Sequence, residues 1–420
     1  MKYKICGGHK LSGTVNLSGN KNSVFPCFAA ALLTSEEVVL ENISDLKDTQ
    51  VLVEILKKLG VRVIQKGSEI KITAYDIKKF SLPGDLMVKL RGSICLVGAL
   101  LGRLRKVNFY HPGGDVIGRR SIETHLEGFK ALGAKLTKNE QRFSLFFEQN
   151  KDQKDCEVFL REASVTATEN LILVSVLGKK TIILRNCAKE PHIVDLCKML
   201  TCMGAKIEGI GGETLVICGV ENLRGTRFKI GADYIELGTY IVAGAITGGE
   251  IKIQGIRELF LDPILEPMKS FGIQITRQDN EITVHPSKLH SVSKLMTNIW
   301  PGFPTDLMSV AIVLATQAKG VTLCHDWMYE GRMFFTDKLI TMGAKITLCD
   351  PHRVLVSGPS RLRGRILATP DIRAGMALVM AALAAKGKSI INQAELIERG
   401  YEDVVGKLTS IGADIERVDV

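Results

Sequence analysis

The chain is poor in aromatic residues and has no long apolar run. Aromatic side chains make up 6% of its 420 residues. Surfaces that bind nucleic acid concentrate basic side chains and often interleave them with aromatic ones, so this composition argues against a nucleic-acid partner.

The longest apolar stretches, such as 374–385, are shorter than the ~18 residues that a membrane span needs, and the start MKYKICGGHK is no apolar signal segment. We therefore expect a cytoplasmic protein with no membrane partner.

The cysteines also lack a pattern. No CxxC pair occurs, and no histidines are interleaved with the cysteines at a metal-binding spacing. Their place in apolar, periodic segments predicts reduced thiols in the core of a cytosolic protein. We expect no disulfide framework, no metal site and no cofactor. The ten residues are Cys6, Cys27, Cys95, Cys156, Cys187, Cys197, Cys202, Cys218, Cys324 and Cys349.

Positive charge is in excess. The 55 basic and 45 acidic residues give a formal net charge of +10, which favours anionic partners. The basic residues are spread along the chain, so small phosphorylated or carboxylated substrates fit better than a polyanion. The sequence carries no signal for an oligomeric state.

One motif occurs six times: an apolar residue, a glycine and then a strand-like apolar run, as in LGVRV at 59–63 and MGAKI at 203–207. Each glycine follows a helix-period segment, for example 48–59 or 193–203, at the place where a helix C-cap needs a positive φ. Each motif therefore predicts the end of a helix and the start of a strand. The glycines recur every 68–73 residues, at Gly60, Gly133, Gly204, Gly272, Gly343 and Gly412.

A second apolar helix-like stretch and a β-branched run precede these helices, as at 31–43, 175–186 and 383–393. The repeat thus reads strand, helix, strand, helix, strand, strand, and three plus three repeats predict two similar α/β domains. The pattern leaves open whether the helices or the sheets lie inside. A strand-like fragment at 11–19 is expected to complete the last repeat, which would place both termini in the second domain.

Polar segments interrupt the apolar elements in all six repeats. Among them are SGNKN (18–22), HPGGDVIGRR (111–120), SVTATEN (164–170), FPTD (303–306), TPDIRAG (369–375) and IERGYED (397–403). Taken alone, an arginine in such a segment is most simply a surface charge, and SGNKN a turn with a helix cap. Taken together, the basic residues at these corners predict a site for more than one phosphate or carboxylate. They are Lys21, Arg91, Arg120, Arg332, Arg373 and Arg399.

The order of these motifs resembles that of the bacterial UDP-N-acetylglucosamine enolpyruvyl transferases over essentially the whole chain. The resemblance implies a two-domain inverted α/β barrel, with three pseudo-repeats in each domain and an active site in the interdomain cleft. One domain would span 22–231 and carry the 111–120 loop, and the other would join 1–21 to 232–420. The implied reaction moves the enolpyruvyl group of phosphoenolpyruvate to the 3-hydroxyl of UDP-N-acetylglucosamine and releases phosphate, the first committed step of peptidoglycan precursor synthesis.

The resemblance also assigns roles to residues. The catalytic residues would be Lys21, Asp115, Asp306 and Arg399, with Asp306 as the base that takes the proton of the sugar hydroxyl. Phosphoenolpyruvate would bind Lys21, Asn22, Arg120, Arg332, Arg373 and Arg399. The nucleotide sugar would bind Asn22, Arg91, Arg120, Ser121, Ile122, Glu123, Thr124, Ser164, Val165, Asp306 and Met328. Glu190 and Asp371 would line the pocket.

Asp115 departs from the usual pattern. Most relatives carry a cysteine here as the general acid that protonates the methylene carbon, and fosfomycin alkylates that thiol. A carboxylic acid can donate the same proton when a closed loop shields it from water, but it does not readily form the thioether. The resemblance therefore implies an active enzyme that resists fosfomycin.

Further departures concern the nucleotide half of the site. They are Glu162 for Lys, Thr166 for Gly, Ser121 for Pro, Tyr234 for Arg and Gly331 for Asn. Three alternatives stay open: transfer to a UMP-type acceptor, transfer to shikimate 3-phosphate, or a paralogue that binds a nucleotide sugar without turnover. The shikimate enzyme lacks the PGG loop, and a silent protein would not need the whole set of anion-binding residues.

Overall fold

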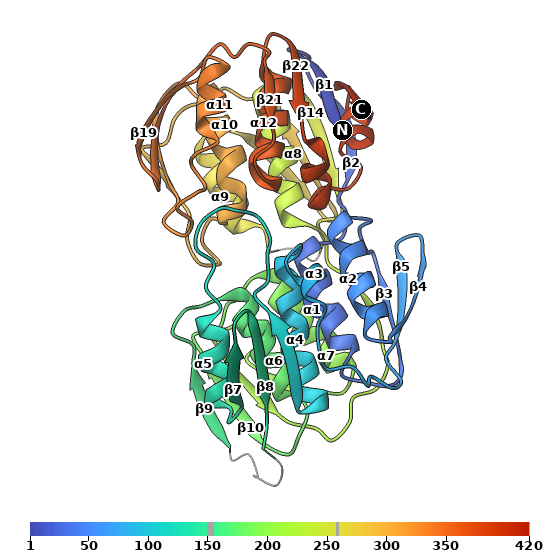
Figure 1. Ribbon diagram of the computed structural model, residues 1–420. Helices are drawn as coiled ribbons and strands as arrows, with labels where there is room; N and C mark the ends of the chain where they lie inside the picture. The colour runs from blue at the N-terminus through green and yellow to red at the C-terminus, as the bar shows by residue number, and fades with distance from the viewer. Residues whose placement is uncertain (149–154, 258–259, 420) are drawn as a thin grey trace. The chain divides into compact units, whose positions relative to one another are not determined.

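The computed structural model describes residues 1–148, 155–257 and 260–419 (Figure 1). Their contacts divide the chain into two compact units. Unit 1 comprises Met1–Ser18, Asp115–Arg119 and Ala232–Val420, and unit 2 comprises Gly19–Gly114 and Arg120–Gly231. The expected domains are 1–21 with 232–420, and 22–231 with the whole 111–120 loop. In the structure the tip of that loop, 115–119, groups with unit 1.

Unit 2 is built around three largely apolar helices that are buried on almost all sides. Nearly every residue of α1 (Lys21–Ala31), α4 (Cys95–Leu104) and α6 (Val165–Ser175) is buried. Helices α4 and α6 pack closely, and the backbone N–H of Gly98 donates to Asn170 Oδ1 at 2.6 Å. A helix without a polar face must lie in a core, so the helices are inside and the sheets outside.

Three small sheets and three amphipathic helices surround this core. The helices are α2 (Lys47–Lys58), α5 (Glu123–Ala131) and α7 (Pro191–Cys202), with the short α3 (Gly84–Met87) and the 3₁₀ turn Arg91–Ile94 before α4. The sheet orders are β13-β3-β5-β4, β6-β8-β7 and β11-β12-β10-β9. The strands are β3 (Glu37–Glu41), β4 (Arg62–Lys66), β5 (Glu69–Thr73), β6 (Lys106–Tyr110), β7 (Lys135–Asn139), β8 (Arg142–Phe146), β9 (Cys156–Phe159), β10 (Thr181–Arg185), β11 (Lys206–Glu208), β12 (Thr214–Cys218) and β13 (Arg227–Lys229).

Unit 1 repeats this plan. Its inner helices are α8 (Tyr234–Thr247), α10 (Met308–Gln317) and α12 (Ile372–Ala384), and α9 (Asp262–Ser270), α11 (Thr336–Thr341) and α13 (Val404–Ser410) follow them. The sheet orders are β15-β16-β14-β2, β17-β18-β20-β19 and β21-β22-β1-β23. The strands are β1 (Lys2–Gly7), β2 (Ser12–Asn16), β14 (Glu250–Gln254), β15 (Gln274–Gln278), β16 (Glu281–His285), β17 (Lys294–Met296), β18 (Gly320–His325), β19 (Lys345–Asp350), β20 (Arg353–Gly358), β21 (Ile366–Ala368), β22 (Gly387–Asn392) and β23 (Asp414–Val418).

The six motif glycines all lie in the left-handed region, with φ between 86° at Gly272 and 103° at Gly204 and Gly343. Each comes directly after a helix C-terminus and before a strand, as predicted. The expected helices at 48–59 and 193–203 correspond to α2 and α7 within two residues.

The strand-like fragment at 11–19 does not complete the last repeat. Its ordered part, β2, pairs in parallel with β14 in the fourth repeat. The strand before it, β1, joins the last sheet instead, between β22 and β23. Both termini do lie in unit 1, and their strands are neighbours (Figure 1).

Only half of the thiols belong to the core. All ten are free, but Cys6, Cys156 and Cys218 are half-buried, and Cys202 and Cys349 are exposed. The prediction of core thiols is wrong for these five, because Cys6, Cys156, Cys218 and Cys349 lie on the less buried faces of surface strands and Cys202 ends the outer helix α7.

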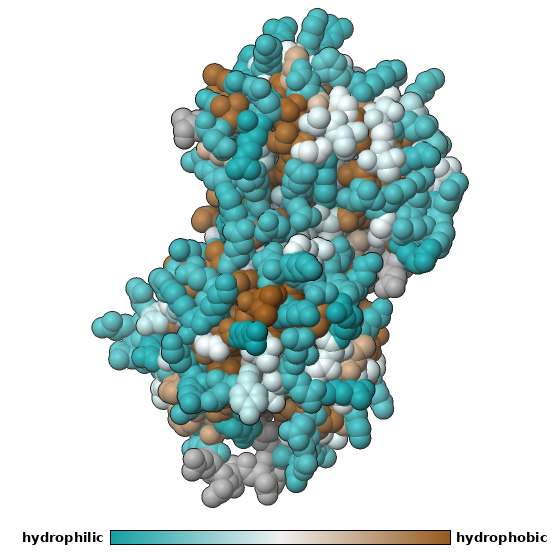
Figure 2. Space-filling view, turned by 90° about the vertical axis from the view of Figure 1, so that its right-hand side faces the viewer, coloured by the Kyte–Doolittle hydropathy of each residue, from teal (hydrophilic) through white to brown (hydrophobic). Residues whose placement is uncertain are grey.

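On the face drawn in Figure 2, hydrophilic side chains predominate and apolar ones show in smaller areas. Within the described residues, each helix is too short or too polar to serve as a membrane span.

A buried carboxyl group makes the stability of unit 2 depend on pH. Burial raises the pKa of Glu169 on α6 to about 8; a hydrogen bond from Cys95 Sγ (3.0 Å) lowers the pKa and the charge of Glu190 raises it. In the unfolded chain the pKa of this group is near its ordinary value of 4.5. Between these values the folded state holds more protons, so the free energy of unfolding falls as pH rises.

Glu169→Gln should therefore flatten the decline in unfolding free energy between about pH 5 and about pH 8, because an amide has no proton to lose. Urea unfolding of parent and variant at several pH values measures the difference. The control is Glu127→Gln, an exposed residue of α5, which should keep the parental slope. Equal slopes for parent and Glu169→Gln would contradict the assignment.

Candidate functional site

The inner helices of unit 1 begin with carboxylates. Asp233 precedes α8, and its Oδ1 accepts hydrogen bonds from the backbone N–H groups of Ile235 (2.8 Å) and Glu236 (3.1 Å). Asp371 precedes α12 and caps it in the same way. Asp306 lies in the 3₁₀ turn that leads into α10. Asp233 and Asp371 thus accept hydrogen bonds from N–H groups that a buried helix start would otherwise leave without partners.

Asp306 is held between two buried arginines. Arg332 Nη2 lies 3.0 Å from Asp306 Oδ1, and Arg373 Nε and Nη2 lie 2.9 and 2.8 Å from Oδ2. Both guanidinium groups are almost fully buried, whereas 29% of the Asp306 side chain is exposed. The paired forks suit a planar anion, so this part of the site is one carboxylate with two arginines around it.

Arg332 depends on a residue that the sequence analysis missed. Asp326 is fully buried; its Oδ1 accepts hydrogen bonds from the N–H groups of Met328 (2.9 Å) and Tyr329 (3.3 Å), and its Oδ2 lies 3.9 Å from Arg332 Nε. Burial would lower the pKa of Arg332, but the charges of Asp306, Asp371 and Asp326 outweigh it and raise the pKa. Asp326 therefore fixes the turn from which Arg332 projects. Met328, one of the predicted site residues, takes part in this turn through its backbone N–H, which donates to Asp326.

Asp115 and Arg399 form an ion pair, with Asp115 Oδ1 and Arg399 Nη1 3.1 Å apart and about a fifth of each side chain exposed. Asp371 is close enough for the Asp115 charge to act on it. Burial raises the pKa of Asp371, the Arg332 charge lowers it and the Asp115 charge raises it. Unit 1 thus brings together Asp115 with the four predicted residues Asp306, Arg332, Arg373 and Arg399, and with Asp371.

The loop tip is fastened within unit 1 beside Asp115. The backbone N–H of Gly331 donates to the carbonyl of Ile117 at 2.8 Å, and the N–H of Arg119 donates to Glu330 Oε2 at 3.2 Å. A Cβ on Gly331 would come within 2.8 to 3.1 Å of the backbone of Ile117. The departure to Gly at 331 therefore permits this close approach.

In unit 2, Lys21 begins α1 and pairs with a buried carboxylate. Its Nζ lies 2.8 Å from Asp48 Oδ2, and less than a tenth of either side chain is exposed. Asn20 caps the helix by accepting from the N–H of Asn22 at 2.9 Å. The expected cap is present, and Asp48, which lies in the first turn of α2, was missed as the partner of Lys21.

Arg91 and Arg120 lie on either side of the loop base. Arg91 Nη2 donates to the carbonyl of Ser121 at 2.9 Å, and Arg91 Cβ and Arg120 Nη1 both lie near Gly114. Ser121 Oγ accepts from the N–H of Glu123 at 3.0 Å and so caps α5. The predicted segment 120–124 is therefore the start of a helix, where an anion is favoured; Ile122 in it is buried.

Ser164 and Val165 begin α6, and the next residue explains a departure. Thr166 Oγ1 lies 2.9 Å from Nε2 of His125, a buried residue that the sequence analysis did not single out. Burial and the charge of Arg91 lower the pKa of His125 to about 3, so its ring is neutral. At a position where relatives usually carry glycine, the side chain of Thr166 thus provides a hydrogen-bond partner for His125.

Glu190 begins α7 and has a buried oxygen without a partner. No described residue bonds to its Oε2. Burial raises the pKa of Glu190 to about 7, and its own backbone N–H and the charge of Lys189 lower it less. A carboxyl group in this state can accept or donate a hydrogen bond.

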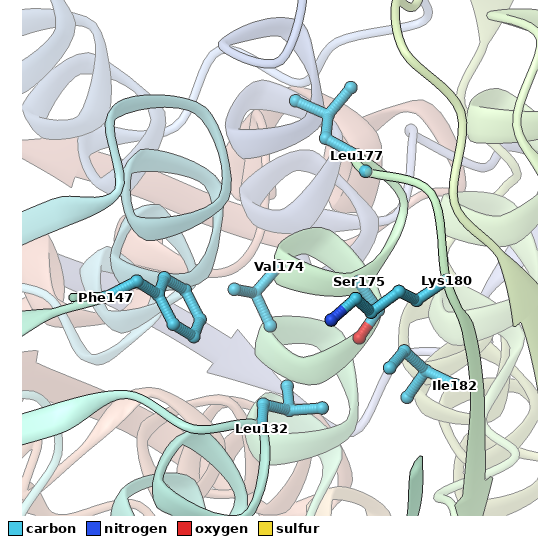
Figure 3. A pocket seen from close by; sticks show the side chains of 8 residues that line it. Leu132, Phe147, Val174, Ser175, Leu177, Lys180 and Ile182 are labelled. Carbon is cyan, nitrogen blue, oxygen red and sulfur yellow. The ribbon is translucent and has the colours of Figure 1, made fainter. Parts of the chain in front are cut away.

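A small cavity lies at the far end of α6 from Ser164. Leu132, Phe147, Val174, Leu177, Gly178 and Ile182 line it, and Lys180 and Ser175 point their polar ends into it (Figure 3). Its volume of about 10 Å³ suits one water molecule. None of the predicted site residues lines it.

Comparison with known proteins gives the family of this chain. The family model for EPSP synthase (3-phosphoshikimate 1-carboxyvinyltransferase) matches residues 5–408. A UDP-N-acetylglucosamine 1-carboxyvinyltransferase of Borrelia garinii is 45% identical over 99% of both chains, and one of Treponema denticola is 44% identical over the same share. The chain belongs to the carboxyvinyltransferase family. Membership makes the chain a transferase.

Solved structures of this family share the fold. The enolpyruvyl transferase NikO of Streptomyces tendae superposes with a TM-score of 0.88 at 26% identity, covering 99% of this chain and 98% of the other. EPSP synthase of Acinetobacter baumannii superposes with a TM-score of 0.76 at 17% identity, covering 99% of each chain. The predicted two-domain α/β fold of βαβαββ repeats is confirmed.

Gly331→Ala should loosen the loop tip, because the added Cβ would collide with the backbone of Ile117 and break a 2.8 Å hydrogen bond. We expect cleavage within 111–120 by a non-specific protease to become severalfold faster, with an unchanged circular dichroism spectrum. Glu330→Gln is the matched control, since an amide oxygen can still accept from the N–H of Arg119. Unchanged cleavage of Gly331→Ala would show that the contact does not hold the loop.

Proposed function

We propose that this enzyme transfers the enolpyruvyl group of phosphoenolpyruvate to the 3-hydroxyl of UDP-N-acetylglucosamine and releases phosphate, the first committed step of peptidoglycan precursor synthesis. The observation that carries this proposal is the 45% identity, over 99% of both chains, to an enzyme named for this acceptor. The grouping of Asp115, Asp306 and three arginines in unit 1 supports it.

Phosphoenolpyruvate supplies a carboxylate and a phosphate, and the proposed binding residues are cationic. Arg332, Arg373 and Arg399 would bind these groups through paired N–H donors. In the structure these arginines are bonded to Asp306 and Asp115. The substrate would therefore exchange with protein carboxylates. Lys21, Asn22 and Arg120 are the further proposed ligands. Lys21 would stabilise the charge that develops on phosphoenolpyruvate.

The reaction needs one base and one acid. Asp306 would take the proton from the sugar 3-hydroxyl while the oxygen of that hydroxyl attacks C2 of phosphoenolpyruvate. Asp115 would donate a proton to C3. The resulting tetrahedral adduct would then lose the C3 proton and phosphate, which restores the double bond. As its two arginines turn to the substrate, Asp306 would become a stronger base.

The acceptor would bind to the starts of helices in unit 2. Arg91, Arg120 and the cap at Ser121 suit a diphosphate. The partnerless oxygen of Glu190 suits an N–H or O–H group of the sugar. The remaining proposed contacts are Asn22, Ile122, Glu123, Thr124, Ser164, Val165, Asp306 and Met328, and Asp371 would line the pocket. We propose that the enzyme works in the cytoplasm, where phosphoenolpyruvate is made.

The acceptor is tested by phosphate release from phosphoenolpyruvate with UDP-N-acetylglucosamine, UMP and shikimate 3-phosphate in turn. Release with UDP-N-acetylglucosamine at the highest kcat/KM supports the proposal. A higher value with UMP would instead favour the UMP-type acceptor, and no release with any acceptor would favour a protein that binds without turnover.

Arg399→Ala and Lys21→Ala should each lower kcat/KM at least about a hundredfold, because losing a charged partner of a desolvated anion costs several kcal/mol. The matched controls are Arg353→Ala and Lys58→Ala, whose exposed ion pairs with Asp350 and Asp85 lie outside the proposed site. Thermal unfolding checks that each variant folds. Near-parental turnover of either test variant would remove that residue from the mechanism.

Asp115 is tested by two substitutions with opposite outcomes. Asp115→Asn keeps the shape without an acidic proton and should abolish transfer, whereas Asp115→Cys should stay active and become sensitive to fosfomycin. The parent should resist fosfomycin, since a carboxylate attacks an epoxide far more slowly than a thiolate. Mass spectrometry of the adduct locates the modified residue. Full activity of Asp115→Asn, or inactivation of the parent through one of its ten cysteines, would overturn this role.

A further inference from the structure

Three side chains with metal-binding atoms meet where the terminal strands β1 and β23 pair, at the end of these strands opposite the chain termini (β1 in Figure 1). They are Cys6 of β1, His9 two residues after the end of β1, and Asp414 at the start of β23. One ligand atom from each lies within 4.8 Å of the other two. Cys6 is half-buried, and His9 and Asp414 are exposed.

The sheet fixes two of these residues. Cys6 and Asp414 are register partners in the antiparallel pair of β1 and β23. Their neighbours Ile5 and Ile415 are buried. Because side chains alternate along a strand, Cys6 and Asp414 both point outward, with Cβ atoms roughly 5 Å apart.

A glycine turn brings the third residue back. Gly8 follows β1 with a φ of 90°, and its N–H donates to the carbonyl of Leu383 at 2.9 Å. This turn is one that other residues rarely adopt. It directs His9 toward the end of the strand that carries Cys6.

None of the three side chains is engaged elsewhere in the part of the chain that the structure describes. No hydrogen bond or ion pair joins Cys6 Sγ, the His9 ring or the Asp414 carboxylate to another described residue. By contrast, the nearby outward pair of Lys4 and Glu416 is bonded, at 2.7 Å. Lys388, opposite Cys6 on β22, is the cation that would compete for Asp414.

We propose that Cys6, His9 and Asp414 form a surface site for a divalent zinc-like cation, with water as the fourth ligand. A thiolate, an imidazole and a carboxylate are zinc ligands, and tetrahedral zinc holds such atoms within about 4 Å of one another, which small rotations of exposed side chains supply. Binding releases the thiol proton, so the two anionic ligands balance the charge of the ion. The ion would link β1 to the edge strand β23 and hold the two ends of the chain together.

The sequence predicts no metal site, because Cys6 and His9 alone lack the paired spacing of a zinc motif. The third ligand comes from the other end of the chain and is supplied by strand pairing. The proposal is independent of the transferase reaction, since none of the three residues belongs to the proposed active site.

The site is tested with Zn²⁺ and Co²⁺ on the full chain in which the exposed Cys202 and Cys349 are changed to Ser. Competition with a chromophoric chelator should give one Zn²⁺ per chain, and Co²⁺ should give a thiolate charge-transfer band. Cys6→Ser and His9→Gln should each weaken binding at least about tenfold and Asp414→Asn less, and Cys6→Ser should remove the band. His285→Gln is the matched control, because half-buried His285 pairs with Glu250 at 3.0 Å without a thiol.

Zn²⁺ should also raise the thermal midpoint of this chain but not that of Cys6→Ser, because a ligand that binds the folded state stabilises it. The rate of enolpyruvyl transfer should be the same with and without Zn²⁺. Binding that survives Cys6→Ser, binding that is lost in His285→Gln, or a thermal midpoint that does not respond to Zn²⁺ would each overturn the proposal.

Discussion

In the described residues, six largely buried helices form the cores of the two units, and the first N–H groups of each need partners. Water does not reach them easily, so side chains must supply oxygen atoms. In unit 1 these atoms come from Asp233 and Asp371, with Asp306 beside the start of α10. Carboxylates at buried helix starts then require cations, and Arg332 and Arg373 meet that need. The charged residues of the candidate site in unit 1 thus follow from the need for partners at the starts of its inner helices.

Unit 2 has different groups at its helix starts. At α1 the side chain of Asn20 accepts a hydrogen bond from the N–H of Asn22, and Lys21, Arg91 and Ser164 lie at the starts of α1, of the 3₁₀ turn before α4 and of α6. The acidic partner of Lys21, Asp48, lies on α2. Cys95, the first residue of α4, neighbours Glu169 of α6. The two units thus share a backbone plan, and the charge at their helix starts differs: carboxylates in unit 1, basic or neutral side chains in unit 2.

Much of the fold could be predicted from the sequence because the glycine after each helix has a strict backbone requirement. Gly60 and its five counterparts reveal the period without reference to tertiary structure. Whether the helices or the sheets lie inside could not be predicted in this way. An apolar helix and an apolar strand each need only to be covered by other residues, and the sequence does not say which. The pairing of β1 with β22 and β23 was also out of reach, because it joins segments from opposite ends of the chain.

The basic residues of the site were predictable because they stand in polar segments between apolar elements. Their partners were not. Asp48 and Asp326 lie in segments that read as an ordinary helix start and a strand end, and only the folded chain brings them to Lys21 and Arg332. His125 was hidden for a similar reason, since its partner Thr166 lies on another helix.

The ion pair of Asp115 and Arg399 has a consequence for how ligands compete. A carboxylate of the protein already occupies Arg399. In the proposed mechanism an incoming anion would have to displace Asp115, and the affinity of that anion would be the difference between two similar interactions. Displacement would release Asp115 when the anion binds. The occupancy of Arg399 by the anion and the release of Asp115 would therefore be one variable, and a weakly binding anion would leave Asp115 paired with Arg399.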